Sequence, residues 1–278
     1  MRAEVILPFG IIDAHGKRAR TAALIPITGH GELFGADDAN PLRAALHLLA
    51  ASTVELGPYR GADIAPALGR LLPVDRDTLL LQLNRLTFGD VRYQTVECPQ
   101  ADCRRRLDVR FALSSAEPPT VPDSAGGTID MPGGRVVHYR LPAATDQAEL
   151  HGLPPAALEA AFLERCVVRD RSDARQVGWS ELMAMPAAIR ADVIKRIVAA
   201  SPEIDLVVPL ACTQCGQPFR FAFDPVLSLL HELRASRTEL LKQIHRLALS
   251  YHWSHREILD LPHALRHEYL ELLHEAGR

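Results

Sequence analysis

The alternation of apolar and polar residues near the N-terminus predicts a β-hairpin followed by a helix. Two apolar runs flank the polar, Gly-containing turn at 13–17, so strands are expected on both sides of it within residues 4–28. Asn40 is a favourable helix cap, and Pro41 fits the first helical position. Apolar residues then recur at helical spacing, and Gly57 is expected to end this helix.

A second helix and two further strands are predicted in the next part of the chain. Residues 58–75 are rich in Pro and Gly and indicate a connection with one short helical piece. Asp77 is placed to cap a leucine-rich helix that ends at 88–90. Apolar and polar residues then alternate over 91–96 and again over 107–113, which is typical of half-buried strands.

The middle of the chain contains the clearest predicted loop, at 114–127, and then returns to regular structure. The Gly-rich stretch at 131–135 is typical of a hairpin turn that precedes another strand. Asp146 and Glu149 have the spacing of a capping box at a helix start. Two helical patterns, each opened by proline, follow at 155–166 and 186–200.

Two more short strands, at 206–210 and 219–223, precede a strong helix start at Asp224 and Pro225. The last fifty or so residues are helical in pattern. Their apolar seam has the spacing of a coiled coil or helical hairpin and consists of Leu240, Ile244, Leu247 and Tyr251. Packing on its own domain and docking of a partner are equally compatible with this seam.

Another capping box is predicted at Ser254 and Glu257, at the start of a short helix that ends near 260–262. Composition supports a largely helical globular protein, because 47% of the 278 residues are hydrophobic and only 5% are aromatic. The length suffices for one large domain or two small ones.

The charge balance disfavours proteins that grip a phosphate backbone, since 31 Lys and Arg face 34 Asp and Glu. The basic run Arg104–Arg106 is interpreted as a solvated turn or strand edge rather than a nucleic-acid contact. The N-terminus lacks the apolar run of a signal peptide, and no stretch approaches ~18 consecutive apolar residues. We therefore expect a cytoplasmic protein without a membrane span, in which paired cysteines indicate metal or redox chemistry.

Two cysteine pairs carry the strongest chemical signal. Cys98 and Cys103 enclose the turn 98–103, and Cys212 and Cys215 enclose the turn 212–215, each between extended segments. Short cysteine spacings of this kind present two thiolates to one ion, and Zn²⁺ prefers four such ligands in a tetrahedron. The sequence therefore predicts one structural zinc ion on all four cysteines, although 108 residues separate the two pairs.

Three other interpretations compete with the shared zinc site. Cys212 and Cys215 alone have redox spacing, the site could hold a catalytic zinc, and the pairs could be unrelated and unliganded. The second pair and the closed set of four ligands favour the structural ion. Cys166 is interpreted as a buried small hydrophobe.

No enzyme is expected, because the sequence has no Gly-rich phosphate loop, no GxSxG motif and no catalytic set of recognisable spacing. No small-molecule substrate is expected either. His263 and His267 are one helical turn apart, but they do not form an HExxH motif, and we interpret them as surface histidines.

These patterns together predict an α+β fold built on a split four-cysteine zinc ribbon, with a β-hairpin at each knuckle. A helical insertion is expected over about 114–205 and a helical hairpin at the C-terminus. We expect a domain at 1–224 that contains the ribbon and a C-terminal helical segment at 225–278.

Two segments resemble a known family. Residues 72–90, which end in Thr-Phe-Gly-Asp, precede the knuckles, and residues 251–262 precede the Tyr-Leu-Glu-Leu-Leu sequence at 269–273. With the N-terminal hairpin and the two knuckles in this order, nearly the whole chain looks like the T-even-phage-type baseplate hub assembly chaperone family. Members occur in contractile phage tails and in phage-tail-like contractile injection systems.

The resemblance implies a non-enzymatic role in building or completing the baseplate hub. The implied partners are baseplate and tail-hub proteins, met in the bacterial host cytosol or in the assembled tail particle. The residues alone leave one alternative, a zinc-ribbon nucleic-acid-binding or transcription-related module. That alternative predicts salt-sensitive binding of DNA or RNA.

Overall fold

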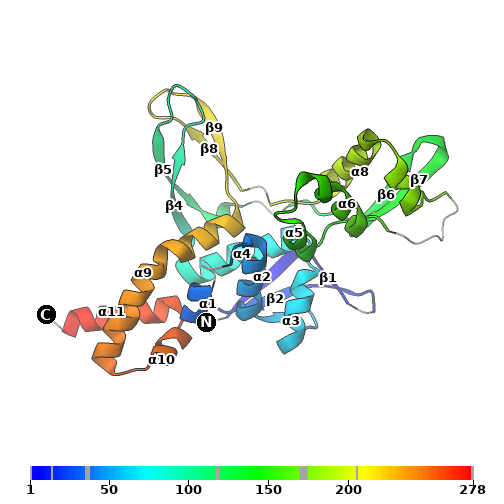
Figure 1. Ribbon diagram of the computed structural model, residues 1–278. Coiled ribbons are helices and arrows are strands. Elements are labelled where there is room, and N and C mark those ends of the chain that lie inside the picture. The colour runs from blue at the N-terminus through cyan, green and yellow to red at the C-terminus, as the bar shows by residue number, and fades with distance from the viewer. Residues whose placement is uncertain are drawn as a thin grey trace.

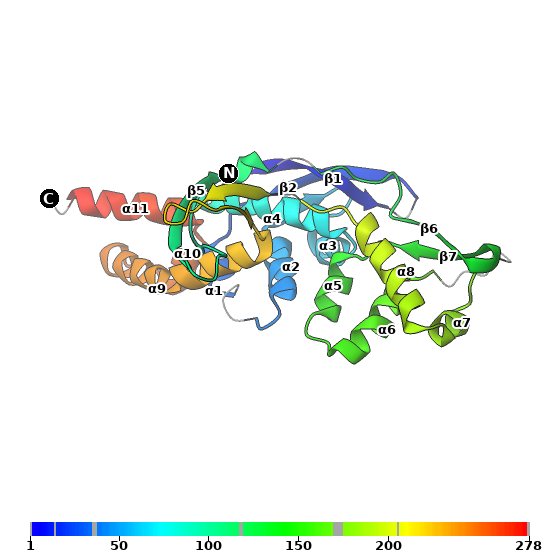
Figure 2. The ribbon, with the colours of Figure 1, turned by 90° about the horizontal axis from the view of Figure 1, so that it is seen from above.

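The computed structural model describes residues 2–13, 15–34, 38–116, 119–168, 175–204 and 206–276. Helices and small antiparallel sheets make up this α+β protein, as predicted (Figure 1). A central body carries a pair of projecting hairpins, the insertion lies at one end, and the C-terminal helices lie at the other (Figures 1 and 2). Within the described residues, no helix has the length and apolar character needed to cross a membrane.

The predicted N-terminal hairpin is confirmed as β1 (Ala3–Ile12) and β2 (Arg18–Leu24), which pair antiparallel. After α1 (Gly29–Phe34), helix α2 (Pro41–Ser52) begins as predicted, with the Asn40 side chain accepting from the N–H groups of Leu42 and Arg43. The prediction that it continues to Gly57 is wrong. Residues Thr53–Leu56 instead form β3, which completes the sheet by pairing with β2.

The main core lies between this sheet and the helices on one of its faces (Figure 2). These helices are α2, the short α3 (Ile64–Gly69) after a 3₁₀ turn at Gly61–Asp63, α4 (Pro73–Phe88) and the first part of α9 (Pro225–Tyr251). Fully buried leucines from each layer meet there, among them Leu7, Leu24, Leu49, Leu68, Leu80 and Leu233.

Helix α4 begins one turn earlier than predicted. Pro73 occupies its first position, so Asp77 lies inside the helix and does not cap it. The earlier start places Asp75 against β1, where its carboxylate accepts from the N–H groups of Phe9 and Gly10 at 2.9 and 3.0 Å. These bonds hold β1 at the irregularity between Ile6 and Ile11.

The insertion has its own apolar core. It comprises the hairpin of β6 (Gly126–Met131) and β7 (Arg135–Arg140), with the helices α5 (Ala144–Leu150), α6 (Pro155–Cys166), α7 (Trp179–Ala184) and α8 (Ala187–Ala200). The hairpin and the helices α6 and α8 match the prediction. The predicted capping box of Asp146 and Glu149 is wrong in position: α5 begins at Ala144, and Asp146 is its third residue, where its carboxylate accepts from the Ala143 N–H and pairs with Arg140.

The C-terminal helices pack on one another. Helix α9 begins as predicted, with the Asp224 carboxylate accepting from the Leu227 N–H. Its seam contacts α10 (His255–Asp260) and α11 (His263–Ala276), so this face is used within the chain. The capping box at Ser254 and Glu257 is confirmed. The domain boundary at 224/225 stays a prediction, although Val226 and its neighbours on α9 belong to the main core.

Candidate metal centre

Two antiparallel hairpins bring the four predicted cysteines together. Strands β4 (Val91–Glu97) and β5 (Arg106–Ala112) form the first, and β8 (Val207–Ala211) and β9 (Pro218–Ala222) form the second. The hairpins stand side by side and project from the body (Figure 1). Their facing sides share an apolar cluster in which Phe111 contacts Phe221 and Phe223, with ring centroids 6.1 and 5.3 Å apart.

The first knuckle is a tight turn between β4 and β5. The Cys98 N–H donates to the Arg105 carbonyl at 2.8 Å, while the N–H groups of Cys103 and Arg104 donate to the Gln100 carbonyl at 3.0 and 3.1 Å. Arg104, directly after the second cysteine, has a positive φ of 49°. This left-handed conformation turns the chain back towards β5 at a modest steric cost for a residue with a Cβ.

The second knuckle repeats this design between β8 and β9. The Cys212 N–H donates to the Gln217 carbonyl at 3.0 Å, and the Gly216 N–H donates to the Cys212 carbonyl at 2.8 Å. Gly216 also follows the second cysteine directly and has a φ of 73°, which glycine adopts without strain. The two knuckles therefore direct their sulfurs to one point through the same turn geometry.

The sulfur positions suit a tetrahedral ion. The Sγ atoms of Cys98 and Cys215 are 3.8 Å apart, those of Cys103 and Cys212 are 3.7 Å apart, and all four lie within 4.8 Å of one another. A tetrahedron with metal–sulfur bonds of about 2.3 Å has an edge of about 3.8 Å, whereas a disulfide requires about 2.05 Å. The four residues lie close together and could bind a metal ion.

The electrostatics of the cluster favour a cation at its centre. The N–H groups of Cys215 and Gln214 lower the pKa of Cys212 to about 6, so this thiol is ionised at neutral pH and can bind a cation as a thiolate. The N–H of Gln100 lowers the pKa of Cys98, but burial and the three neighbouring sulfurs outweigh it and raise the value to about 12. Four thiolates at this spacing repel one another, and a divalent cation removes that repulsion.

The other predicted site residues lie elsewhere. Cys166 is buried in the core of the insertion, where burial raises the pKa of its thiol to about 11, as expected for an unreactive side chain. Among the described residues, the four cysteines are the one group of three or more His, Cys, Asp or Glu side chains close enough to share an ion.

The interpretation of His263 as a surface histidine is wrong. Its side chain is only 21% exposed and packs against the Phe88 ring at 4.9 Å, with Nδ1 3.6 Å from a Glu32 carboxylate oxygen. His267 is more exposed, and its Nε2 lies 3.0 Å from the side-chain nitrogen of Gln243. Burial, together with His263 and Arg266, lowers the pKa of His267.

Sequence reasoning missed the buried ion pair beside these histidines. Arg266 is fully buried and donates to Glu32, a residue of α1 that is itself buried. The signal was weak, because an isolated arginine in an amphipathic helix usually faces solvent.

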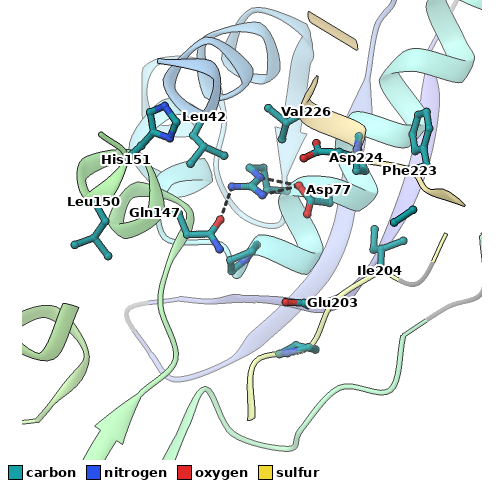
Figure 3. A pocket seen from close by; sticks show the side chains of 15 residues that line it. Leu42, Asp77, Gln147, Leu150, His151, Glu203, Ile204, Phe223, Asp224 and Val226 are labelled. Carbon is teal, nitrogen blue, oxygen red and sulfur yellow. Dashed lines mark hydrogen bonds and ion pairs between the residues drawn. The ribbon is translucent and has the colours of Figure 1, made fainter. Parts of the chain in front are cut away.

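A pocket of about 610 Å³ lies where α4, α5 and the start of α9 meet (Figure 3). Asp77, which was predicted as a cap, lines it and is joined to Arg76 at 2.7 Å, and Arg76 also donates to Gln147. Burial raises the pKa of Asp77. Glu203 and Asp224 add further carboxylates to the lining.

The chain matches no protein-family model, no curated protein and no solved structure.

Proposed function

We propose that Cys98, Cys103, Cys212 and Cys215 hold one structural Zn²⁺ ion and that the two hairpins form a split zinc ribbon. The sulfur spacing of 3.7–3.8 Å within the pairs carries this proposal, because it equals the edge of a zinc–thiolate tetrahedron. Each close pair joins one cysteine from each knuckle, so the ion cross-links two hairpins that are distant in the chain.

The closed ligand set favours a structural role over the alternatives. Four thiolates leave no open coordination position for a water molecule or substrate, which a catalytic zinc requires. An isolated redox pair is also disfavoured, because the sulfurs of Cys212 and Cys215 each lie within 3.8 Å of a sulfur from the other knuckle. The ion would instead contribute to folding, since structural zinc binds with on the order of 10 kcal/mol.

Metal analysis of purified protein tests the site. We expect one zinc per chain in the wild type and almost none in the Cys215→Ser variant, which should also lose several kcal/mol of unfolding free energy. Cys166→Ser is the matched control, because this buried thiol lies in the insertion core and should leave the zinc content unchanged. A wild-type protein that is fully stable without zinc would refute the site.

For the whole chain, we propose a non-enzymatic assembly chaperone, or minor component, of the baseplate hub in a contractile tail or injection system. The resemblance of 72–90 and 251–262 to the hub chaperone family motivates this proposal. In the structure, Phe88 of the first segment contacts His263, which directly follows the second segment.

The architecture is compatible with a protein that binds other proteins. The hairpin pair extends from the body as a separate arm (Figure 1), and the four-cysteine cluster lies between its knuckles. A cross-linked arm of this kind presents a fixed surface at low entropic cost, which favours association. The proposed partners are baseplate and tail-hub proteins.

Co-expression with each neighbouring tail-hub protein, followed by affinity capture and size-exclusion chromatography, tests the assignment. We expect at least one stable or transient complex, and we expect deletion of this gene to reduce the yield of complete baseplates. The proposal would be contradicted if the protein stays monomeric in the presence of every hub protein and the deletion strain makes normal baseplates.

A further inference from the structure

The outer edge of β5 is an unpaired strand edge. The Cys98 N–H donates to the Arg105 carbonyl, and the Leu113 N–H donates to the Asp90 carbonyl. In an antiparallel pair, hydrogen-bonded positions alternate along each strand. The residues of β5 that bond to β4 are therefore 107, 109 and 111, and the main-chain groups of 106, 108 and 110 point away from β4.

No main-chain partner meets these outward groups within the described residues. A groove of about 400 Å³ runs along this edge instead, lined by residues 105–110 and, from the other hairpin, by Leu210, Ala211 and Thr213. An unpaired strand edge beside a groove is the geometry that accepts an added strand.

Strand β8 forms the opposite wall of the groove, and its outer edge cannot form the full set of main-chain hydrogen bonds with an added strand. Two bonds, from the Cys212 N–H to Gln217 and from the Phe223 N–H to Leu206, place residues 207, 209 and 211 on the outer edge of β8. Residue 209 is proline, which has no N–H to donate. The edge of β5 has no proline, so it is the edge available to an incoming chain.

The same edge carries arginines without acidic partners. The side chains of Arg105, Arg106 and Arg110 are exposed, and within the described residues none of them has an ion pair, whereas Arg104 is paired with Glu97. Side chains two residues apart share a face of a strand, so Arg106 and Arg110 lie on the same outward side. Asp108 lies between them and accepts from the Thr95 hydroxyl.

We propose that the β5 edge binds an extended acidic segment of a partner protein as an added strand. The main chain of that segment would pair with Arg106, Asp108 and Arg110, and two carboxylates four positions apart would face Arg106 and Arg110. This inference rests on the proposed function, because it names the chemistry by which a protein partner is held. A nucleic acid could use the arginines, but it could not add a strand to this edge.

Fluorescence anisotropy on the full zinc-loaded chain tests this site. The probe is a labelled peptide of alternating Thr and Val with two Glu residues four positions apart, and the comparison peptide carries Lys at the same two positions. We expect the acidic peptide to bind and the basic one not to bind. The double variant Arg106→Gln with Arg110→Gln should weaken binding about tenfold.

The matched control is Arg246→Gln with Arg256→Gln, which changes the net charge equally at two exposed arginines of α9 and α10. It should leave binding unchanged, and zinc content reports that both double variants are folded. Amide hydrogen exchange gives an independent readout. Peptide binding should newly protect the amides of residues 106, 108 and 110, whereas those of 107, 109 and 111 are already bonded to β4.

The inference is overturned if the Arg106/Arg110 variant binds the acidic peptide as the wild type does, if the new protection lies elsewhere, or if a single-stranded DNA of similar length binds more tightly than the peptide. Failure of this site and failure of the proposed function give different results. If hub proteins still bind the Arg106/Arg110 variant, only this site is wrong, whereas absence of any hub complex with the wild type concerns the function itself.

Discussion

Asp75 is the residue whose environment departs most from that of an ordinary aspartate. It is fully buried between α4 and β1, and its carboxylate accepts from two backbone N–H groups. Burial raises its pKa to about 6, although these two hydrogen bonds and the nearby Arg18 and Arg20 act in the opposite direction. Its charge therefore costs free energy in the folded state at neutral pH.

This pKa predicts a pH dependence of stability. Between pH ~4 and pH ~6 the unfolded chain releases the Asp75 proton while the folded chain keeps it, so stability falls as the pH rises. Relative to Asp75→Asn, the unfolding free energy of the wild type should fall by about 3 kcal/mol as the pH rises across this window. Urea unfolding of both proteins at several pH values measures it, and parallel pH profiles would contradict it.

At the scale of elements, α9 is the helix that joins two separate cores. Its first turns contribute Val226, Leu229 and Leu230 to the main core, and its last turns contribute Leu240 and Leu247 to the cluster with α10 and α11. The predicted seam is thus buried within the chain, and the other side of the helix faces solvent, where Leu249 is 64% exposed.

Two alanine substitutions on this one helix should therefore differ sharply. Leu247→Ala removes a fully buried side chain and should cost about 2–5 kcal/mol of unfolding free energy. Leu249→Ala, two residues along the same helix, should change stability by less than about 0.5 kcal/mol. Denaturant titrations of the two variants provide the test, and equal losses would show that the helix is rotated from the orientation described here.

For the whole molecule, two side-chain clusters bring together parts that are far apart in the chain. The cysteine cluster joins the two hairpins, and the pair of Glu32 and Arg266 joins α1 to α11, with Gln243 as a further partner. Burial raises the pKa of Glu32, but the hydrogen bonds and charges of His263 and Arg266 outweigh it and lower the pKa below its usual value. The stabilisation by Glu32 is therefore present at neutral pH and is lost as the pH falls through this lowered pKa.

Breaking this buried pair should be costly, but replacing it should not be. Glu32→Leu and Arg266→Met should each lose about 3–5 kcal/mol, because each leaves a buried charge without its partner. The double variant Glu32→Leu with Arg266→Met should recover most of that loss. A double-mutant cycle measured by denaturant unfolding tests this, and additive losses would contradict the coupling.

The sequence by itself determined features that depend on residues close to one another in the chain. The cysteine pairs, the caps at Asn40, Asp224 and Ser254, and the alternation along the hairpin strands depend on neighbours within a few residues, and the structure agrees with each. Short-range hydrogen bonds and side-chain periodicity are encoded in consecutive residues, so many of them can be predicted without knowledge of the fold. The predicted caps at Asp77 and Asp146 failed because both helices begin earlier in the chain.

Only the tertiary structure decided the features that depend on distant parts of the chain. Thr53 and Val54 leave α2 because β2 offers them a strand to pair with, and α4 starts early enough to place Asp75 against β1. The burial of Arg266 depends on Glu32, a residue that lies more than two hundred positions away. Each of these outcomes is set by a partner that sequence spacing does not reveal, because burial and strand pairing are properties of the packed chain.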